Sequence, residues 1–198
     1  MSKSELFQFE EEIIECFLQG EIRTPIHLVG GNEDQLIELF KDIKPNDWVF
    51  STYRSHLHAL LKGIPAEQLK RDILSGRSMH INSREHKFFT SSIVGGCLPI
   101  AVGVAMAIQR KGLDDKVLVF VGDMGAETGI FHECSKYAAG FDLPIKFVIE
   151  DNGLSVNSPT AVTWGNHEYC LLYPQKVKRY EYERVYPHQG TGIWVEFR

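Results

Sequence analysis

The chain has few cysteines, and none of them forms a paired motif. The four cysteines are scattered over 198 residues without a C-x-x-C pair: Cys16, Cys97, Cys134 and Cys170. This spacing argues against a zinc site or a disulfide framework and favours reduced cysteines in a cytoplasmic protein. The sequence also lacks a P-loop lysine motif and a G-x-G-x-x-G fingerprint, so P-loop hydrolysis and nicotinamide redox chemistry are disfavoured.

Positive charge and long apolar runs are scarce too. The 21 Lys and Arg residues are outnumbered by 26 Asp and Glu residues, and the formal net charge of −5 argues against a nucleic-acid partner. No apolar run is long enough to cross a membrane, and the acidic N-terminal stretch is unlike a secretory signal. Hydrophobic residues make up 43% of the chain and charged residues 24%, as in globular domains. We therefore expect one domain over residues 1–198, with no membrane or nucleic-acid partner.

Residues 116–160 have the pattern of a strand, a helix and a second strand. Lys116–Val121 and Ile145–Ile149 are β-branched and aromatic runs typical of buried parallel strands. Ile130–Ala139 lies between them with apolar residues at helical spacing, and Gly140 ends it. The side of this helix expected to be buried carries Ile130, Cys134, Tyr137 and Ala138. The order and length predict one βαβ unit with parallel strands.

Polar residues follow both predicted strands. Asp123 and Asn152 lie just beyond the carboxyl ends, where open α/β sheets bind ligands. Neighbouring strands are about 4.8 Å apart, so a carboxylate and an amide oxygen there can share one Mg²⁺ with ligands at about 2.1 Å. The turn at Gly125 and Ala126 would present backbone N–H groups to an anion at the start of the following helix. The pattern predicts a Mg²⁺–diphosphate site, against the alternative of an Asp and an Asn that only form turns.

These residues resemble the metal–diphosphate motif of thiamine diphosphate enzymes, which is Gly-Asp-Gly, a spacer of two dozen or more residues, and Asn-Asn. Gly122 and Asp123 match its first half, Asn152 matches its second half, and residues 125 to 150 form a 26-residue spacer. The resemblance implies that the side chains of Asp123 and Asn152 and the backbone carbonyl of Leu154 hold Mg²⁺. It also makes Gly122 part of the cofactor site.

The chain departs from this motif at two positions. Met124 stands in place of the third-position glycine, and Asp151 stands in place of the first Asn, as in transketolases. Glycine is used where φ is positive or a ligand approaches the backbone closely. Met124 therefore keeps open the alternative of a non-catalytic binding or regulatory subunit that retains the fold. Glu150-Asp151-Asn152 keeps open another alternative, the N-terminal subunit of a split transketolase-like enzyme that acts on a ketose.

Two further stretches resemble the alpha subunit of 2-oxo acid dehydrogenases. Residues 26–34 resemble its His-Leu-x-x-Gly-Gln-Glu stretch, which makes His27 a catalytic candidate. Tyr53, Arg54 and His56 match its Tyr-Arg-x-His run, in which tyrosine and arginine contact the cofactor's diphosphate and the histidine lies near the reacting carbon. The planar donor fork of arginine suits a diphosphate for physical reasons as well. Without the resemblance, a structural histidine and an interface pair would be the simpler interpretations.

The resemblance continues through a long loop and a helix. Residues 77–92 lack periodicity, and Ser78-Met79-His80 within them resembles the family's Gly-Ser-Met-His, which makes His80 a catalytic candidate. Ile93-Val94-Gly95 leads into a helix, up to residue 109, that is apolar on nearly every side and is expected to be buried. This entry resembles the family's Ile-Val-Gly-x-x-x-Pro, where backbone groups meet the aminopyrimidine ring, so Val94 is a predicted cofactor contact.

The remaining segments are expected to complete the domain. Leu6–Phe17 predicts an amphipathic helix with a solvated acidic face, Asn32 can cap a helix over residues 33–41, and Trp48–Thr52 predicts a strand. Residues 176–186 mix charges of both signs with tyrosines, which is typical of a solvated or subunit-facing strand. Several aromatic positions are available for an interface: Trp164–Tyr173, Tyr180, Tyr182 and Tyr186. Gly192–Phe197 predicts a closing strand.

These patterns predict an α/β domain with a mainly parallel sheet flanked by helices on both faces, the diphosphate-binding type of domain in thiamine diphosphate enzymes. The resemblance implies the alpha-type subunit of a heteromeric enzyme that uses thiamine diphosphate and Mg²⁺. The implied reaction is decarboxylation of a 2-oxo acid, followed by acyl transfer or oxidation. The resemblance also implies a pyrimidine-binding, beta-type partner subunit that supplies the catalytic glutamate.

Overall fold

The computed structural model describes residues 1–165 and 176–188 of the chain. Its centre is a five-stranded sheet in the order β2-β1-β3-β4-β7, in which every neighbouring pair of strands is parallel. The strands are β1 (Trp48–Ser51), β2 (Phe88–Thr90), β3 (Val117–Gly122), β4 (Ile145–Asp151) and β7 (Val177–Glu181). Because all five strands run in the same direction, their carboxyl ends meet at one edge of the sheet.

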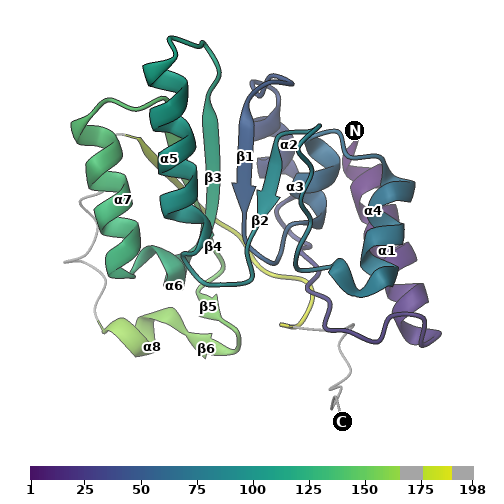
Figure 1. The fold of residues 1–198 in the computed structure, drawn as a ribbon. Coiled ribbons are helices and arrows are strands. Elements are labelled where there is room, and N and C mark those ends of the chain that lie inside the picture. The colour runs from purple at the N-terminus through teal and green to yellow at the C-terminus, as the bar shows by residue number, and fades with distance from the viewer. Residues whose placement is uncertain (166–175, 189–198) are drawn as a thin grey trace.

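Helices cover both faces of this sheet (Figure 1). One face carries α1 (Lys3–Leu18), α2 (Glu33–Phe40), α3 (His56–Leu61) and α4 (Ala66–Asp72), and the other carries α5 (Cys97–Arg110) and α7 (Gly129–Gly140). Successive strand residues point to opposite faces, so β3 sends Leu118 and Phe120 into one core and Val119 and Val121 into the other. The predicted fold class is confirmed.

The predicted βαβ unit is confirmed around β3 and β4, which are adjacent and parallel. The connection between them consists of α6 (Asp123–Ala126) and α7. The predicted buried side of α7 is wrong in part, because Phe131 faces the sheet while Ile130 and Tyr137 are exposed. The Phe131 ring packs edge-on against Phe147 of β4, with ring centroids 5.7 Å apart. A buried aromatic ring contributes a large contact area, and its packing sets the rotation of the helix.

The segment 77–92, predicted to be a loop, contains β2. Its residues Phe88–Thr90 pair with Val49–Ser51 of β1, and Phe88 is buried in the same core as α1 to α4. The strand is only three residues long. So short a run shows no measurable periodicity, and its pairing depends on β1 rather than on local sequence.

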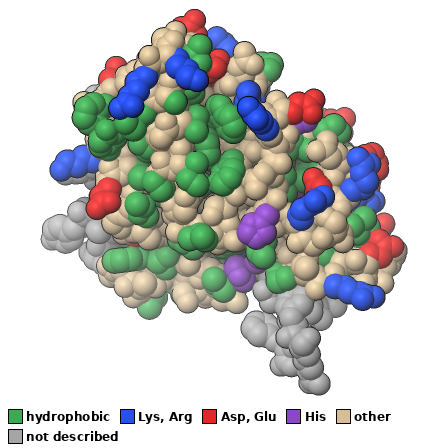
Figure 2. All heavy atoms as spheres, in the orientation of Figure 1, with side chains coloured by type: hydrophobic (Ala, Val, Ile, Leu, Met, Phe, Trp, Pro, Cys, Tyr) green, Lys and Arg blue, Asp and Glu red, His purple; other side chains and the backbone are tan. Residues whose placement is uncertain are grey.

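α5 has an exposed side, although the sequence predicts burial on nearly every side. Leu98, Ala101 and Ala105 are buried, whereas Ile100 is 46% exposed. Figure 2 shows hydrophobic side chains gathered over the part of the surface where α5 and α7 lie in Figure 1. We call this surface the α5–α7 face, and its exposed apolar residues include Ile100, Ile130, Tyr137 and Phe141. Contiguous apolar surface of this kind is typical of a protein contact site.

The C-terminal part of the described chain returns to the sheet. After β4 come the short strands β5 (Leu154–Ser155) and β6 (Ser158–Pro159) and the helix α8 (Thr160–Trp164). β7 then pairs with β4, and residues 182–188 follow it. Among the described residues, no helix combines the length and the apolar composition that a membrane span requires.

The tyrosines of this segment are used within the chain. Tyr180 and Tyr186 pack against the core beneath α1 to α4, and the Tyr182 hydroxyl group hydrogen-bonds with Asn152. All three side chains remain partly exposed, so their contact with another subunit stays a prediction. Most of the Trp164–Tyr173 stretch, Cys170 and the predicted strand Gly192–Phe197 lie outside the described residues.

Two glycines allow residues 182–188 to cross the loop before α2. Gly30 and Gly31 have positive φ angles of 54° and 97°. A β-carbon on Gly31 would lie 2.1 Å from the backbone oxygen of Glu183. The backbone of the crossing segment thus occupies the space of a side chain, and only glycine fits there.

Gly31→Ala is expected to lower the free energy of unfolding by about 3 kcal/mol, because the positive φ costs roughly 1–2 kcal/mol and the collision with Glu183 adds to it. Gly112→Ala is the matched control, since Gly112 has a φ of 63° and nothing lies within 4 Å of its added β-carbon. Urea unfolding followed by circular dichroism measures both losses. Equal losses would contradict a close approach of residues 182–188 to Gly31.

Candidate functional site

A pocket opens at the carboxyl edge of the sheet. β1 is followed by β2 on one side, and β3 is followed by β4 on the other, which makes the gap between β1 and β3 the switch point where open α/β sheets bind ligands. The segments after β1, β2, β3 and β4 all contribute to the pocket wall. The predicted site residues that line it are Tyr53, Arg54, Val94, Gly122, Asp123, Gly125, Asn152 and Leu154.

The other predicted residues lie outside this wall. Ala126 is buried beneath the pocket, in the core between the sheet and α5. His27 is buried behind Tyr53, with ring centroids 4.6 Å apart, and His56 is buried at the start of α3. His80 is exposed in the loop before β2. Apart from Ala126, the structure therefore brings the predicted cofactor and metal residues together at one pocket. It places His27 and His56 behind them and His80 away from them.

Asp123 begins α6, directly after β3. Its side chain is buried and accepts a hydrogen bond from the hydroxyl group of Thr160, at the start of α8. Burial raises the pKa of the Asp123 carboxyl group, the Thr160 hydrogen bond opposes this rise, and the charge of Asp151 adds to it. A buried carboxylate with a like charge nearby is stabilised by a bound cation.

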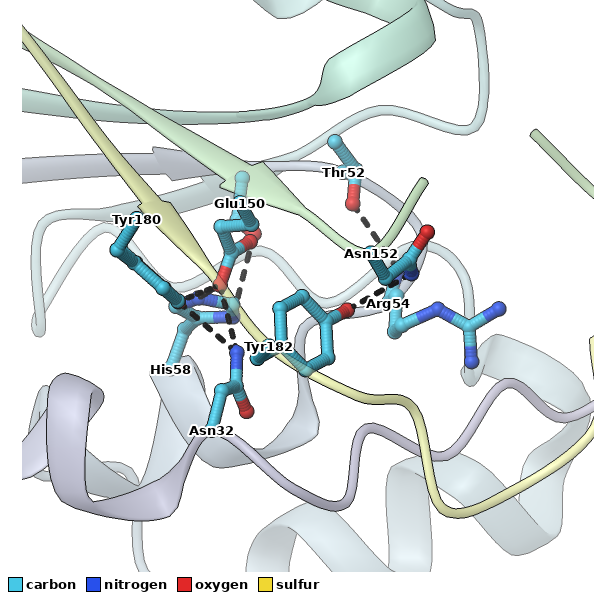
Figure 3. Close-up of polar contacts among 9 residues, drawn as sticks. Asn32, Thr52, Arg54, His58, Glu150, Asn152, Tyr180 and Tyr182 are labelled. Atoms are coloured by element: carbon cyan, nitrogen blue, oxygen red, sulfur yellow. Dashed lines mark hydrogen bonds and ion pairs between the residues drawn. The ribbon is translucent and has the colours of Figure 1, made fainter. Parts of the chain in front are cut away.

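Asn152 follows β4 and is held from two sides. Its Nδ2 donates a hydrogen bond to the hydroxyl oxygen of Tyr182 over 3.0 Å (Figure 3). Its Oδ1 accepts a hydrogen bond from the backbone N–H of Leu154, also over 3.0 Å. Because an amide oxygen has two lone pairs, Oδ1 can accept this bond and still bind a metal ion.

The donor set fits Mg²⁺. Asp123 offers a carboxylate oxygen, Asn152 an amide oxygen and Leu154 a backbone carbonyl, and all three residues line the pocket. Mg²⁺ takes such hard oxygen ligands and completes its octahedron with water and phosphate oxygens. Among the described residues, no lysine or arginine forms a salt bridge with Asp123. The carboxylate is therefore available to a metal ion.

Arg54 is oriented by backbone groups. Its guanidinium group donates to the carbonyl oxygen of Leu28, and to that of His188 over 3.1 Å. A guanidinium group has five N–H donors, so these two contacts fix its direction and leave donors for a ligand in the pocket. An anionic group with several oxygens, such as a diphosphate, matches this arrangement.

His27 and His56 are buried and uncharged at neutral pH. Burial lowers the pKa of His27 to about 4, and its Nδ1 donates to the backbone oxygen of His188 over 2.7 Å. Burial, with a smaller effect of His27, lowers the pKa of His56 to about 3. His56 Nε2 hydrogen-bonds with Ser78 Oγ over 2.9 Å. Neutral imidazoles each carry one donor and one acceptor nitrogen, so both can transfer a proton.

The segment 182–188 contributes residues that the sequence motifs did not identify. Arg184 lines the pocket and donates to the backbone oxygen of Val156 over 3.2 Å. Burial and the nearby charge of Arg54 lower the pKa of Arg184. Two guanidinium groups in one pocket repel each other, and an anionic ligand between them relieves this repulsion. No local pattern marks Arg184, because it reaches the pocket only through the pairing of β7 with β4.

A buried polar network supports the pocket from behind (Figure 3). Glu150 Oε1 accepts hydrogen bonds from Tyr180 (2.6 Å), Asn32 (3.0 Å) and His58 (3.2 Å). Asn32 precedes α2 as predicted, but its side chain makes no capping bond and joins this network instead. The network ties β4, β7, α2 and α3 together next to Asn152. Among the described residues, Asn32 Oδ1 is its one buried polar side-chain atom without a hydrogen-bond partner.

Met124 fits the turn without strain. It lies within α6 and is not among the residues with positive φ, so its backbone conformation does not require glycine. The indole Nε1 of Trp164 lies 2.9 Å from its sulfur atom. The position with little space for a side chain is Gly125, where a β-carbon would lie 2.8 Å from Val121 Cγ2. The departure from the Gly-Asp-Gly motif thus leaves the backbone of the site intact.

The family model described as "Dehydrogenase E1 component" matches residues 2–167. This match covers most of the chain and includes every predicted site residue. The chain belongs to the dehydrogenase E1 component family. The predicted resemblance to 2-oxo acid dehydrogenase alpha subunits is confirmed, and the family favours this interpretation over a split transketolase. The matched region ends before Tyr182, Arg184 and His188.

Two curated relatives are alpha subunits. Subunit alpha-3 of the chloroplastic pyruvate dehydrogenase E1 component from Arabidopsis thaliana is 32% identical over 160 residues, which cover 73% of this chain and 37% of the relative. The alpha subunit of acetoin:2,6-dichlorophenolindophenol oxidoreductase from Bacillus subtilis is 30% identical over 165 residues, which cover 78% of this chain and 50% of that relative. The chain thus spans half or less of the length of these two relatives.

A solved structure of a candidate thiamin diphosphate-dependent enzyme from Mycobacterium smegmatis is also similar. It has a TM-score of 0.47 and 23% identity, and the match covers 68% of this chain and 23% of that one. This likeness is too weak to add to the E1 assignment, which rests on the family match and the alpha-subunit relatives.

Proposed function

We propose that this chain is the alpha-type, diphosphate-binding subunit of a heteromeric thiamine diphosphate-dependent enzyme that decarboxylates a 2-oxo acid and passes on or oxidises the acyl group. One observation carries the proposal: Asp123, Asn152 and Arg54 line a single pocket at the carboxyl edge of the sheet. Oxygen ligands for a metal and a guanidinium donor stand together there, as a Mg²⁺–diphosphate group requires. Membership of the E1 family supports thiamine diphosphate as the molecule that carries this group.

Different residues of the pocket are proposed to contact different parts of the cofactor. Asp123, Asn152 and the Leu154 carbonyl would hold Mg²⁺. Tyr53 and Arg54 would contact the diphosphate, and the backbone around Val94 would contact the aminopyrimidine ring. When bound, thiamine diphosphate supplies the carbanion chemistry that decarboxylation of a 2-oxo acid needs. The protein supplies orientation and charge.

The two buried histidines are proposed to hold or move a proton near the substrate. Each has a neutral ring whose other nitrogen is fixed by a neighbour: His27 by the His188 carbonyl and His56 by Ser78. The His188 carbonyl requires a protonated Nδ1 in His27 and so leaves its Nε2 as an acceptor. The Ser78 hydroxyl group can donate or accept, so it holds the His56 ring without fixing its tautomer. His80 is included as a third catalytic candidate on the resemblance alone.

We propose a pyrimidine-binding, beta-type partner that supplies the catalytic glutamate. Ile93 and Val94 are 73% and 64% exposed and lie on the pocket wall, so an apolar rim surrounds part of the pocket. A second protein surface on this rim would exclude water and complete the site.

The names of the relatives, pyruvate dehydrogenase and acetoin oxidoreductase, support a small carbonyl substrate. The buried free cysteines Cys16, Cys97 and Cys134 support a cytoplasmic location.

Calorimetric titration of the assembled protein with thiamine diphosphate, in the presence and absence of Mg²⁺, tests the proposal. Tight binding is expected only with Mg²⁺, because the diphosphate otherwise meets the Asp123 carboxylate directly. Equal binding without the metal would contradict the metal site. A protein that binds no thiamine diphosphate under either condition would contradict the proposed function.

His27→Ala and His56→Ala are each expected to lower turnover ~10²–10⁴-fold while cofactor affinity stays close to that of the wild type. The control is His86→Ala, because His86 hydrogen-bonds with Ser83 (2.8 Å) in the loop before β2 and is not part of the pocket wall. Steady-state kinetics and cofactor titration separate the two effects. If both variants turn over normally, the histidines have a structural role only.

A further inference from the structure

A buried carboxylate holds the loop that carries His27, and nothing in the proposed chemistry uses it. Glu10 of α1 is 1% exposed, although the sequence predicts a solvated acidic face for this helix. Its Oε1 accepts a hydrogen bond from the backbone N–H of Val29 over 2.6 Å, and its Oε2 accepts one from that of Gly30 over 3.2 Å. Burying a carboxylate is costly, so its two backbone contacts call for an explanation.

The loop held by Glu10 in turn orients the wall of the pocket. The carbonyl oxygen of Leu28, next to Val29, accepts a hydrogen bond from the Arg54 guanidinium group. The ring of His27 packs against Tyr53. Arg54 therefore bonds to the carbonyl oxygen of the same peptide group whose N–H Glu10 fixes, and Tyr53 packs against a ring two residues before Val29.

We propose that Glu10 is a positioning residue for the diphosphate site: by fixing the Val29 and Gly30 amides, it sets the Leu28 carbonyl that orients the Arg54 guanidinium group. This inference rests on the proposed function. Both oxygens of the ionised carboxylate accept a bond here, whereas a protonated carboxyl group or a glutamine amide offers one good acceptor. Glu10→Gln therefore keeps the shape of the side chain and removes one of the two hydrogen-bond acceptors.

The charge of Glu10 depends on the groups that face it. Burial raises its pKa to about 7, the two amide hydrogen bonds and Arg54 oppose the rise, and Glu33 of α2 adds to it. Tyr186 of the crossing segment also faces Glu10. Because the folded state raises this pKa above its ordinary value, the free energy of unfolding falls as pH rises from about 4.5 to about 7. The ionised form that holds the loop with both oxygens is thus the less stable one.

The test compares the wild type with Glu10→Gln and with Glu15→Gln, a control that is exposed on the same helix. Each protein, in its assembled full-length form, is titrated with Mg²⁺ and thiamine diphosphate, and its amide hydrogen exchange is measured in residues 26–32 and in β3. At pH 8, Glu10→Gln is expected to bind about tenfold more weakly and to exchange faster in residues 26–32, with β3 unchanged. The difference from the wild type should shrink toward pH 6, where Glu10 of the wild type is protonated.

Three results would overturn the inference, for different reasons. Wild-type affinity and exchange in Glu10→Gln would show that the two amides need no ionised partner. Faster exchange in β3 as well would show that Glu10 supports the whole fold rather than the site. A wild-type protein that binds no thiamine diphosphate would overturn the proposed function itself, and with it the role of Glu10 toward the cofactor.

Discussion

Asp123→Ala is expected to abolish Mg²⁺-dependent binding of thiamine diphosphate, with a loss of at least about 100-fold in affinity. Loss of a residue that only hydrogen-bonds to a metal ligand already lowers metal affinity by roughly 10–100-fold. The carboxylate of Asp123 is the one negatively charged group in the proposed ligand set of Asp123, Asn152 and Leu154. Without it, the metal keeps two neutral oxygen ligands from the protein, and the diphosphate loses the cation that neutralises it. Asn152→Ala should give a smaller loss of the same kind.

Stability measurements separate this loss of binding from unfolding. The folded state raises the pKa of Asp123. At pH values above the ordinary pKa of an Asp side chain, the ionised carboxylate therefore lowers the free energy of unfolding. Asp123→Asn, which keeps an acceptor for the Thr160 hydroxyl group, is therefore expected to unfold at or above the wild-type temperature at pH 7 and still to lose binding. Asp114→Ala is the control, since Asp114 is exposed before the opposite end of β3. Unchanged affinity in Asp123→Ala would contradict the metal assignment.

The part of the site that lies near β3 and β4 could be predicted because its signal is local. Each strand is a run of buried residues, and Asp123 and Asn152 follow the two runs directly. Parallel pairing of neighbouring strands then brings the two side chains to one pocket without any further information. The same logic places Tyr53 and Arg54, which follow the strand run of β1.

Other parts of the site depend on pairings that no local pattern records. Asn32 is 118 positions from Glu150 in the sequence, and His27 is 161 positions from His188. Asn is typical of a helix cap, and Glu is typical of a solvated helix face. In the folded chain Asn32 instead bonds to Glu150, and Glu10 bonds to the backbone N–H of Val29. The sequence of β7 has mixed charge, and only the position of β7 beside β4 shows that Tyr180 packs against the core.

The exposed apolar surfaces next to the pocket set the expected behaviour of the chain in isolation. Val94 and Ile93 are exposed on the pocket wall, and Ile100 belongs to the neighbouring α5–α7 face (Figure 2). Obligate interfaces bury roughly 2,000 Å² or more and are rich in apolar residues. A pocket whose rim is apolar and open to water cannot exclude solvent from a reactive carbanion. We therefore expect the proposed catalysis to depend on a second subunit over this rim.

The 198-residue chain alone is expected to show no decarboxylase or ketol-transfer activity and to bind thiamine diphosphate weakly, and addition of a beta-type subunit is expected to restore both. Ile100→Glu should block this assembly, because it places a charge on the apolar α5–α7 face, whereas Phe7→Glu should not, since Phe7 is 52% exposed on α1, on the other side of the sheet. Light scattering measures the assembly, and turnover is measured on the same samples. Robust turnover by the isolated chain, with its mass showing a single subunit, would contradict the need for a partner. Equal assembly of the two glutamate variants would move the interface away from α5.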